Sequence, residues 1–254
     1  MKVALVTGGG RGIGRAAAEA LAQSGAAVAI CGRGLPALEE VAAAMRAGGS
    51  RALALACDVS NPDDIARTIA AVTAELGAPD ILVNNSGIAR SAKFAATDDA
   101  EWHAHLDVNL MGAVRMTRAA LPAMLQRGWG RIINVASVAA KIGFLYSTAY
   151  CASKHALLGL TRALALETAT RGVTVNAVCP GWVDTDMAAA AIDRIDSRTR
   201  MGEAAARDTL AQMSPQKRLM TATEVAATIA YLASDAAAGV HGQGWNIDGG
   251  EVMS

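Results

Sequence analysis

The chain has 254 residues, of which 52% are hydrophobic and 18% charged, enough for one large α/β domain with a substantial core. Its 23 basic residues balance 23 acidic ones, so no net field favours nucleic acid or an anionic membrane as a partner. The first apolar run is too short for a signal peptide or membrane span, and the four cysteines form no C-x-x-C pair. We therefore expect a cytoplasmic globular protein that binds neither nucleic acid nor membrane.

Short apolar runs alternate with longer stretches of helical spacing. The runs predict strands at 2–7, 26–31, 51–57, 80–84, 131–136, 173–179 and 243–247. The longer stretches predict helices near 12–24, 35–47, 62–76, 100–127, 148–170 and 222–234. Continuously apolar strands suit a parallel sheet that is covered on both faces. The repeated β-α units predict a single α/β domain over 1–254, a doubly wound (Rossmann) sheet of about seven strands.

Residues 186–215 interrupt this alternation. The segment is helix-prone, carries mixed charge and follows the sixth predicted strand. Ligands of a doubly wound sheet bind beyond the carboxyl ends of its strands. We therefore predict that 186–215 forms a small helical lid over the ligand crevice. The alternative is a pair of surface helices without ligand contact.

A glycine-rich turn lies near the start of the chain. Five glycines occupy the seven positions 8–14, between the apolar run 3–6 and the alanine-rich stretch 15–25. A strand, a tight glycine turn and a helix form an anion site, because glycine permits close backbone approach and the helix N–H groups point at the ligand. Ile13 stands where the strict G-x-G-x-x-G fingerprint has its last glycine, so the turn alone is weak evidence for a nucleotide phosphate.

Four polar residues, Asn109, Ser137, Tyr150 and Lys154, stand out in apolar surroundings. Tyr150 and Lys154 are four residues apart and share one face of a predicted helix. Each residue alone has an ordinary explanation: a helix-kinking asparagine, a capping serine, a core-edge tyrosine or a solvated lysine. Combined with the glycine turn, they indicate one site.

The sequence resembles the short-chain dehydrogenase/reductase family over nearly its whole length. The matching elements are TGGGRGIG (7–14), CDV (57–59), NNSG (84–87), Asn109, Ser137, Tyr150, Lys154 and PGWVDT (180–185). One departure is Ser86, where the family usually has alanine. The resemblance is closest to 3-oxoacyl thioester reductases and aromatic polyketide ketoreductases.

The resemblance implies catalytic roles for Asn109, Ser137, Tyr150 and Lys154, with Asn109 fixing a water that links the lysine to solvent. It also implies that Lys154 holds the nicotinamide ribose, that 180–185 holds the carboxamide side of the ring, and that Asp58 and Val59 border the adenine. The predicted cofactor-binding residues are Thr7, Gly8, Gly10, Arg11, Gly12, Ile13, Gly14, Arg33, Asp58, Val59, Asn85, Ser86, Gly87, Tyr150, Lys154, Pro180, Gly181, Val183 and Thr185.

The tyrosine–lysine pair suits the reduction of a ketone, which needs a hydride at carbon and a proton for the developing alkoxide. The pKa of tyrosine in water, about 10, is too high for easy proton exchange near neutrality. We expect the Lys154 ammonium and an oxidised nicotinamide to stabilise the tyrosinate and lower the pKa of Tyr150. Ser137 can donate a hydrogen bond to the substrate oxygen.

The end of the second predicted strand indicates which dinucleotide is bound. An acid usually stands there when the adenosine ribose carries only hydroxyls, but this chain has Gly32 followed by Arg33. With Arg11 from the glycine turn, two guanidinium groups and no carboxylate predict a pocket for a 2′-phosphate and hence NADP(H). The alternative for Arg11 is a side chain that faces solvent.

The predicted substrate-facing residues are mostly apolar: Ser137, Phe144, Leu145, Tyr150, Trp182, Met187 and the run 188–192. They favour an apolar or thioester-linked ketone over a sugar. Arg194, Arg198 and Arg200 are candidates to meet the phosphates of a CoA or carrier-protein arm, or else form a solvated face. His103 and His105 are two apart and point to different helix faces, so no metal site is predicted.

These features predict an NADP(H)-dependent oxidoreductase that reduces a ketone to a secondary alcohol. The alternatives are an oxidative hydroxyacyl-CoA or secondary-alcohol dehydrogenase, and a non-catalytic dinucleotide sensor, which the four occupied catalytic positions disfavour. Alanine- and leucine-rich faces at 100–127 and 148–170, an edge strand at the chain end and the family resemblance predict a homotetramer.

Overall fold

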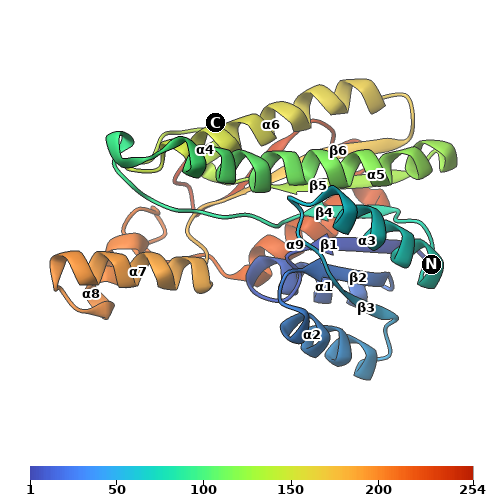
Figure 1. Cartoon of the computed structure of the whole chain (residues 1–254), viewed down its shortest axis with the longest axis horizontal. Coiled ribbons are helices and arrows are strands. Elements are labelled where there is room, and N and C mark those ends of the chain that lie inside the picture. Colours follow the sequence, from blue (N-terminus) through green and yellow to red (C-terminus); the bar gives the residue numbers. More distant parts are fainter. Residues whose placement is uncertain (254) are drawn as a thin grey trace.

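Seven parallel strands form the centre of the computed structural model, which describes residues 1–253 (Figure 1). They are β1 (Val3–Thr7), β2 (Ala27–Gly32), β3 (Ala52–Ala56), β4 (Ile81–Asn84), β5 (Gly130–Val135), β6 (Val173–Pro180) and β7 (Gly244–Ile247). Their order is β3-β2-β1-β4-β5-β6-β7, so the direction of winding reverses between β1 and β4. The predicted doubly wound sheet is confirmed, and its ligand crevice belongs at this reversal.

The helices are α1 (Gly12–Gln23), α2 (Leu35–Ala47), α3 (Pro62–Glu75), α4 (Asp99–Leu106), α5 (Gly112–Arg127), α6 (Thr148–Thr168), α7 (Asp186–Thr199), α8 (Glu203–Ala211) and α9 (Ala222–Ala233). Short turns are η1 (Phe94–Ala96), η2 (Asp107–Met111), η3 (Val138–Ala140) and η4 (Asp235–Ala237). The predicted helical stretch near 100–127 is confirmed, and within it the π-helical turn η2 joins α4 to α5. The buried Asn109 lies in that turn and hydrogen-bonds the chain that follows β4.

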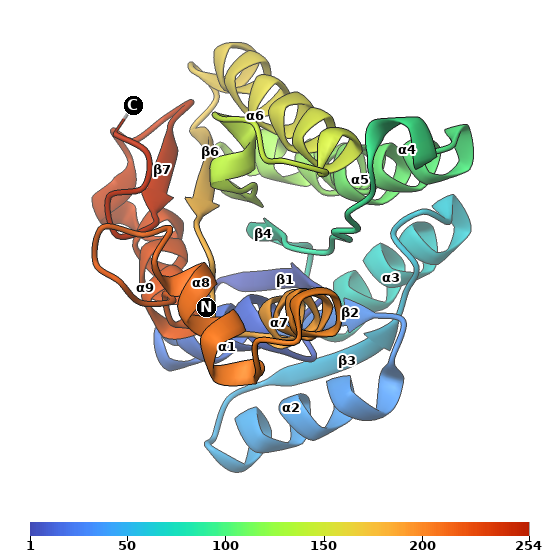
Figure 2. The ribbon, with the colours of Figure 1, turned by 90° about the vertical axis from the view of Figure 1, so that its left-hand side faces the viewer.

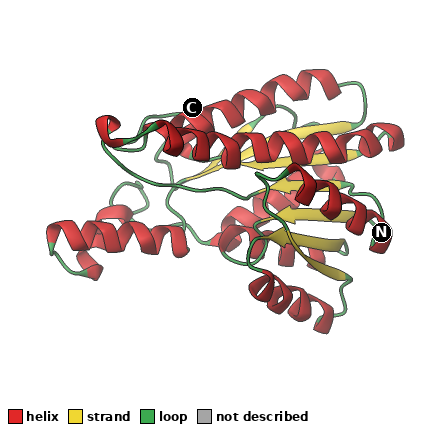
Figure 3. Ribbon diagram, viewed as in Figure 1, coloured by secondary structure: helices red, strands yellow, loops and turns green. Residues whose placement is uncertain are grey.

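Helices cover both faces of the sheet (Figures 2 and 3). Alternate residues of β1 show this: Ala4 and Val6 belong to the core shared with α1, α2 and α9, whereas Val3 and Leu5 belong to the core shared with α3 and α5. Both sets of side chains are therefore buried, which explains why the strand sequence is apolar without alternation.

Two local features of the sequence mark the ends of elements. The Asn61 side chain accepts a hydrogen bond from the backbone N–H of Asp63 at 2.9 Å, and Pro62 is the first residue of α3. Gly172, between α6 and β6, has a φ of 70°, and a Cβ there would lie 2.0 Å from the Gly128 carbonyl oxygen. Only glycine fits this crossing of two chain segments.

The segment predicted as a lid consists largely of α7 and α8. Ala188 and Ile192 of α7 pack with Ala206 and Leu210 of α8 in a small core of their own. Figure 1 shows the two helices standing apart from the helix layers, and Figure 2 shows them in front of the sheet. Among residues 1–253, no helix is both long and apolar enough to cross a bilayer.

Candidate active site

The glycine turn between β1 and α1, residues 8–14, exposes its backbone, and we call this turn the glycine cradle. Gly8 and Gly12 have φ values of 68° and 52°, which glycine adopts readily. A Cβ on Gly14 would lie 2.2 Å from the Gly8 carbonyl oxygen, so the turn closes on itself only because this side chain is absent. Arg11, the N-cap residue of α1, makes no capping hydrogen bond with its side chain. The first N–H groups of the helix therefore stay free for an anion.

The segment after β4 fixes this cradle from the neighbouring strand. The Thr7 hydroxyl oxygen accepts hydrogen bonds from the backbone N–H groups of Asn85 and Ser86, both at 2.9 Å. The Asn85 amide donates to the carbonyl oxygens of Thr7 and Gly8 at 2.8 and 3.2 Å. Ser86 Oγ lies 3.3 Å from the position a Cβ on Gly8 would occupy, so serine fits beside the turn without displacing it.

A cavity of about 710 Å³ extends from the cradle over the ends of β2 and β3. Twelve of the predicted cofactor residues line it: Gly8, Gly10, Arg11, Gly12, Ile13, Arg33, Asp58, Val59, Asn85, Ser86, Gly87 and Thr185. Thr7 and Gly14 support the cradle from behind. Tyr150, Lys154, Pro180, Gly181 and Val183 line a second, adjoining cavity. The structure thus gathers the predicted cofactor residues around one continuous cleft.

The two arginines predicted near the adenosine ribose have different surroundings. Arg33 is exposed at the cavity and forms no ion pair among residues 1–253. Hydrogen bonds from Ser60 hold the pKa of Asp58 below its ordinary value, and the Arg33 charge adds to this. Arg11 instead pairs with Asp186 at 3.1 Å. Both side chains of that pair are at least 70% exposed, so the pairing is weak and can exchange for a ligand.

Ser137, Tyr150 and Lys154 line the second cavity, of about 500 Å³. Ser137 follows β5 and its Oγ accepts a hydrogen bond from the Ala139 N–H at 3.1 Å, which starts η3. Tyr150 and Lys154 lie on successive turns of α6. Lys154 is 4% exposed, and its ammonium donates to the Val135 carbonyl oxygen at 2.7 Å.

Burial dominates the ionisation of the tyrosine and the lysine. It raises the pKa of the Tyr150 phenol, while a hydrogen bond with Ser137 acts in the opposite direction. Burial also lowers the pKa of Lys154 to about 8. The sequence led us to expect that the Lys154 ammonium and an oxidised nicotinamide together lower the pKa of Tyr150; burial acts against this, and the combined effect stays a prediction. The Lys154 ammonium is 5.8 Å from the centroid of the tyrosine ring and is bonded to Val135, so its field does not outweigh the loss of water.

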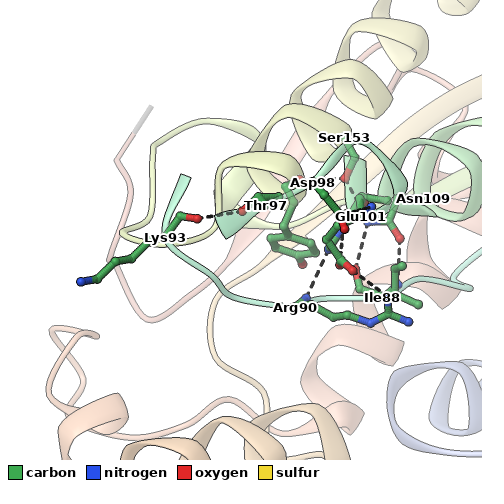
Figure 4. Close-up of polar contacts among 10 residues, drawn as sticks. Ile88, Arg90, Lys93, Thr97, Asp98, Glu101, Asn109 and Ser153 are labelled. Atoms are coloured by element: carbon green, nitrogen blue, oxygen red, sulfur yellow. Dashed lines mark hydrogen bonds and ion pairs between the residues drawn. The ribbon is translucent and has the colours of Figure 1, made fainter. Parts of the chain in front are cut away.

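Asn109 connects the cofactor side of the site to α6. Its Oδ1 accepts from the Ile88 N–H at 2.8 Å, and its amide donates to the Ile88 carbonyl at 3.0 Å and to Ser153 Oγ at 2.9 Å (Figure 4). A Cβ on Gly87 would lie 3.2 Å from Asn109 Oδ1 and 3.6 Å from Lys154 Nζ. A side chain at Gly87 would therefore crowd the Asn109 amide and lie next to the Lys154 ammonium.

The 500 Å³ cavity also contains the predicted substrate residues. Phe144, Leu145, Trp182 and Met187 all line it, with Ala188 and Ala191 of the run 188–192. Ile192 instead packs in the core between α7 and α8. Arg194 and Arg198 line the cavity, but Arg200 does not: it ends α7 with a φ of 55°.

The structure also shows residues that the sequence patterns did not reveal. Tyr146 lines the substrate cavity with a φ of 63°, unusual for a tyrosine, and its carbonyl accepts from the Ala92 N–H at 2.9 Å. His105 is buried and packs edge-on against the Tyr150 ring. The available signal was a histidine in a predicted helix, but its partner, Tyr150, lies 45 positions away in the sequence. Among residues 1–253, no three histidine, cysteine or acidic side chains are grouped as metal ligands.

Comparison with known proteins identifies the family. The family model for short chain dehydrogenases matches residues 2–196. The chain belongs to the short-chain dehydrogenase family. It is 40% identical over 253 residues to the 3-oxoacyl-[acyl-carrier-protein] reductase FabG of Pseudomonas aeruginosa, covering 100% of this chain and 98% of that protein. It is 38% identical over 252 residues to the D-beta-hydroxybutyrate dehydrogenase of Cupriavidus necator, covering 99% and 98%.

Among solved structures, a variant of the actinorhodin polyketide ketoreductase crystallised with NADPH matches with a TM-score of 0.95 and 40% identity. The alignment covers 98% of this chain and 97% of that one. The protein is therefore an oxidoreductase of the short-chain dehydrogenase family that uses a nicotinamide dinucleotide. The glycine cradle and the free N–H groups of α1 fit the phosphates of such a cofactor.

The buried lysine predicts how stability depends on pH. Between the folded pKa of about 8 and the ordinary value of 10.5, the unfolded chain binds the Lys154 proton more strongly than the folded chain. We compare the unfolding free energy of the unsubstituted protein with that of Lys154→Met. The difference, unsubstituted minus variant, should rise with pH in this window, by at most about 1.4 kcal/mol per pH unit. Urea unfolding at several pH values measures this difference. Lys93→Met, at an exposed lysine, is the control and should give a flat line; a flat line for Lys154→Met would contradict the burial effect.

Proposed function

We propose that the protein reduces a ketone to a secondary alcohol with NADPH as the hydride source. The observation that carries this proposal is the junction of the two cavities. Ile13, Gly87, Arg90 and Thr185 are among the residues that line both. Tyr150, Ser137 and Lys154 all line the apolar cavity next to this junction. A bound dinucleotide can therefore present its nicotinamide to a carbonyl that also meets the tyrosine hydroxyl.

The roles proposed for the side chains follow from their positions. The nicotinamide, when bound, supplies the hydride to the carbonyl carbon. Tyr150 donates its proton to the carbonyl oxygen, and Ser137 donates a hydrogen bond to the same oxygen as charge develops. Lys154 holds the nicotinamide ribose, and its ammonium stabilises the tyrosinate that remains. Asn109 holds the water through which the lysine exchanges protons with solvent.

Burial makes the Tyr150 phenol a weaker acid, so donation of its proton depends on stabilisation of the tyrosinate that is left. A phenol with a raised pKa stays protonated at neutral pH, as a proton donor to an alkoxide must. The positive charge of an oxidised nicotinamide would arise beside it only as the hydride leaves, which is when tyrosinate needs stabilisation. The site thus favours the neutral phenol before reaction and the anion after it.

The choice of NADPH rests on Arg33. Its guanidinium is exposed at the dinucleotide cavity without an ion pair among the described residues, and Gly32 places no carboxylate at the end of β2 itself. Arg11 lies in the same cavity and can exchange its exposed partner Asp186 for the phosphate. The similarity to a ketoreductase solved with NADPH supports this choice.

The oxidative direction remains as the second candidate function. The same proton path operates in reverse for a secondary alcohol, and the similarity to a D-beta-hydroxybutyrate dehydrogenase favours a hydroxy acid or hydroxyacyl substrate for it. A non-catalytic dinucleotide sensor is disfavoured. It would not need Tyr150, Ser137 and Lys154 around an apolar cavity.

A 3-oxoacyl thioester or related apolar ketone is the proposed substrate class. The cavity wall is formed largely by Phe144, Leu145, Trp182, Met187 and the small alanines of α7. A sugar would lose water from its hydroxyls there and find few partners. Arg194 and Arg198 lie one helical turn apart on the cavity side of α7 and form no ion pair among residues 1–253. They suit the phosphates of a CoA or carrier-protein arm.

Assembly and location are also proposed. Leu166 of α6 is 82% exposed, and Tyr231 stacks on Trp245 of the edge strand β7 with both rings at least 36% exposed. These apolar surfaces suit contacts between copies of the chain, and we propose a homotetramer built from them together with α4 and α5. The four cysteines are free and buried, which supports a reducing cytoplasm as the location.

The cofactor proposal predicts the effect of Arg33→Asp. NADPH should exceed NADH in kcat/KM about ten- to a hundredfold in the unsubstituted protein, because charged hydrogen bonds contribute about 1.5–3 kcal/mol. Arg33→Asp should shrink or reverse this preference, as initial rates with both cofactors will show. Arg171→Asp makes the same charge change at an exposed loop arginine outside the cleft and should leave the preference unchanged. Equal efficiency with both cofactors before substitution would contradict the proposal.

The substrate proposal predicts that two thioesters respond differently to the substitution of Arg194 and Arg198. With NADPH, 3-oxoacyl-CoA and the N-acetylcysteamine thioester of the same acid should both exceed ketoses and aryl ketones in kcat/KM. Replacing Arg194 and Arg198 together by glutamine should raise KM for the CoA ester about tenfold, the loss of roughly one charged hydrogen bond. The shorter ester has no phosphates and should change little, and Arg200→Gln should change neither. A ketose with the highest kcat/KM would overturn the proposed class.

A further inference from the structure

A buried imidazole lies against the ring of Tyr150. His105 occupies the last turn of α4, and its side chain is 0% exposed. The two ring centroids are 6.4 Å apart and the ring planes meet at 72°, an edge-to-face arrangement. This geometry is favourable for a pair of aromatic rings. The phenol ring of Tyr150 therefore has a packing partner that comes from a different helix.

Hydrogen bonds at both nitrogens fix the plane of this imidazole. Nε2 lies 3.2 Å from the backbone N of Arg90, and Nδ1 lies 2.9 Å from the Glu101 carbonyl oxygen. A backbone N–H can only donate, so Nε2 accepts and the ring proton is on Nδ1. Rotation of the ring would break two partly buried hydrogen bonds and leave the nitrogens of a buried imidazole unpaired, which is unfavourable. The orientation of the imidazole relative to the Tyr150 ring is therefore fixed.

The same contacts tie the chain after β4 to α4. Arg90 Nη1 donates to Glu101 Oε2 at 2.9 Å, and Figure 4 shows these two side chains pointing toward each other. Glu101 Oε1 lies 3.1 Å from His105 Nδ1. Arg90 lines both the substrate cavity and the dinucleotide cavity. The imidazole is thus anchored at the junction where hydride transfer is proposed.

Asn109 provides the matching anchor for the backbone of the tyrosine. Its amide donates to Ser153 Oγ, and Ser153 in turn donates to the Tyr150 carbonyl oxygen at 2.7 Å. The backbone of Tyr150 is therefore held through Ser153. The ring of Tyr150 projects away from that backbone and needs a separate support, and His105 is the aromatic neighbour in place to give it.

We propose that His105 is a positioning residue for Tyr150, and that its fixed ring sets the direction of the phenol hydroxyl in the substrate cavity. This rests on the proposed role of Tyr150 as proton donor. His105 lines neither cavity, so it acts only through the tyrosine and the chain at Arg90. Proton transfer depends on the alignment of the hydroxyl with the carbonyl oxygen, so a displaced ring reduces turnover more than binding.

A double-mutant cycle with Tyr150→Phe tests this proposal. His105→Leu should lower kcat about tenfold, within the loss expected for a small displacement of a catalytic group, and should leave the Kd for NADPH within about twofold. In the Tyr150→Phe background, followed at high enzyme concentration, His105→Leu should change the residual turnover less than about twofold, because the hydroxyl it aligns is already gone. His103→Leu, at an exposed histidine on the same helix, is the matched control and should not change kcat.

Two results would overturn the inference: an unchanged kcat in His105→Leu, or an equal loss in both backgrounds, which would indicate a purely structural role. If His105→Leu does not fold, as judged by circular dichroism, His105→Phe keeps a ring against Tyr150 without its two hydrogen bonds. That variant should lose less than tenfold, again only where Tyr150 is present. High turnover in Tyr150→Phe alone would instead contradict the proposed function, so the two failures are distinguishable.

Discussion

The ammonium of Lys154 is almost completely removed from water, and the surrounding site is organised around the cost of keeping it there. Burial of a cation without full compensation is unfavourable, which is why the pKa of Lys154 falls to about 8. The carbonyl oxygen of Val135 at 2.7 Å compensates only in part. The Lys154 ammonium can therefore gain stabilisation in the cleft from a nearby anion or from ribose hydroxyls. Such an anion would form one helical turn away if Tyr150 gave up its proton and became a tyrosinate.

The parallel sheet makes this arrangement possible. The winding reverses between β1 and β4, and the chain after each strand end contributes one part of the site. The turn after β1 gives the glycine cradle, the segment after β4 fixes it through Thr7 and Asn85, and Ser137 follows β5. Because α6 packs on η3, the tyrosine and the lysine are brought to the same edge as the serine. The rigid strand ends therefore bring side chains that are far apart in the sequence to one edge of the sheet.

Much of the fold and of the candidate site could be predicted from the sequence, because both depend in part on local sequence patterns. Apolar runs located all seven strands, and the spacing of Tyr150 and Lys154 placed both on one face of α6. Features that depend on long-range packing were missed. The π turn contains Asn109, whose side chain hydrogen-bonds Ile88 21 positions away, and the raised pKa of Tyr150 depends on burial that no spacing reveals. The contact of His105 with Tyr150 is of the same kind.

Tyr150 is proposed to donate the proton, while the cofactor is held mainly by other groups. Tyr150→Phe removes one hydroxyl and leaves the ring, its contact with His105 and the buried Lys154 in place. The most direct measurement compares NADPH binding by fluorescence titration with ketone turnover in this variant. The account predicts a Kd within about threefold of the unsubstituted protein and a kcat lower by about 100- to 10,000-fold, the usual contribution of a general acid. A variant that keeps a tenth or more of the turnover would contradict it.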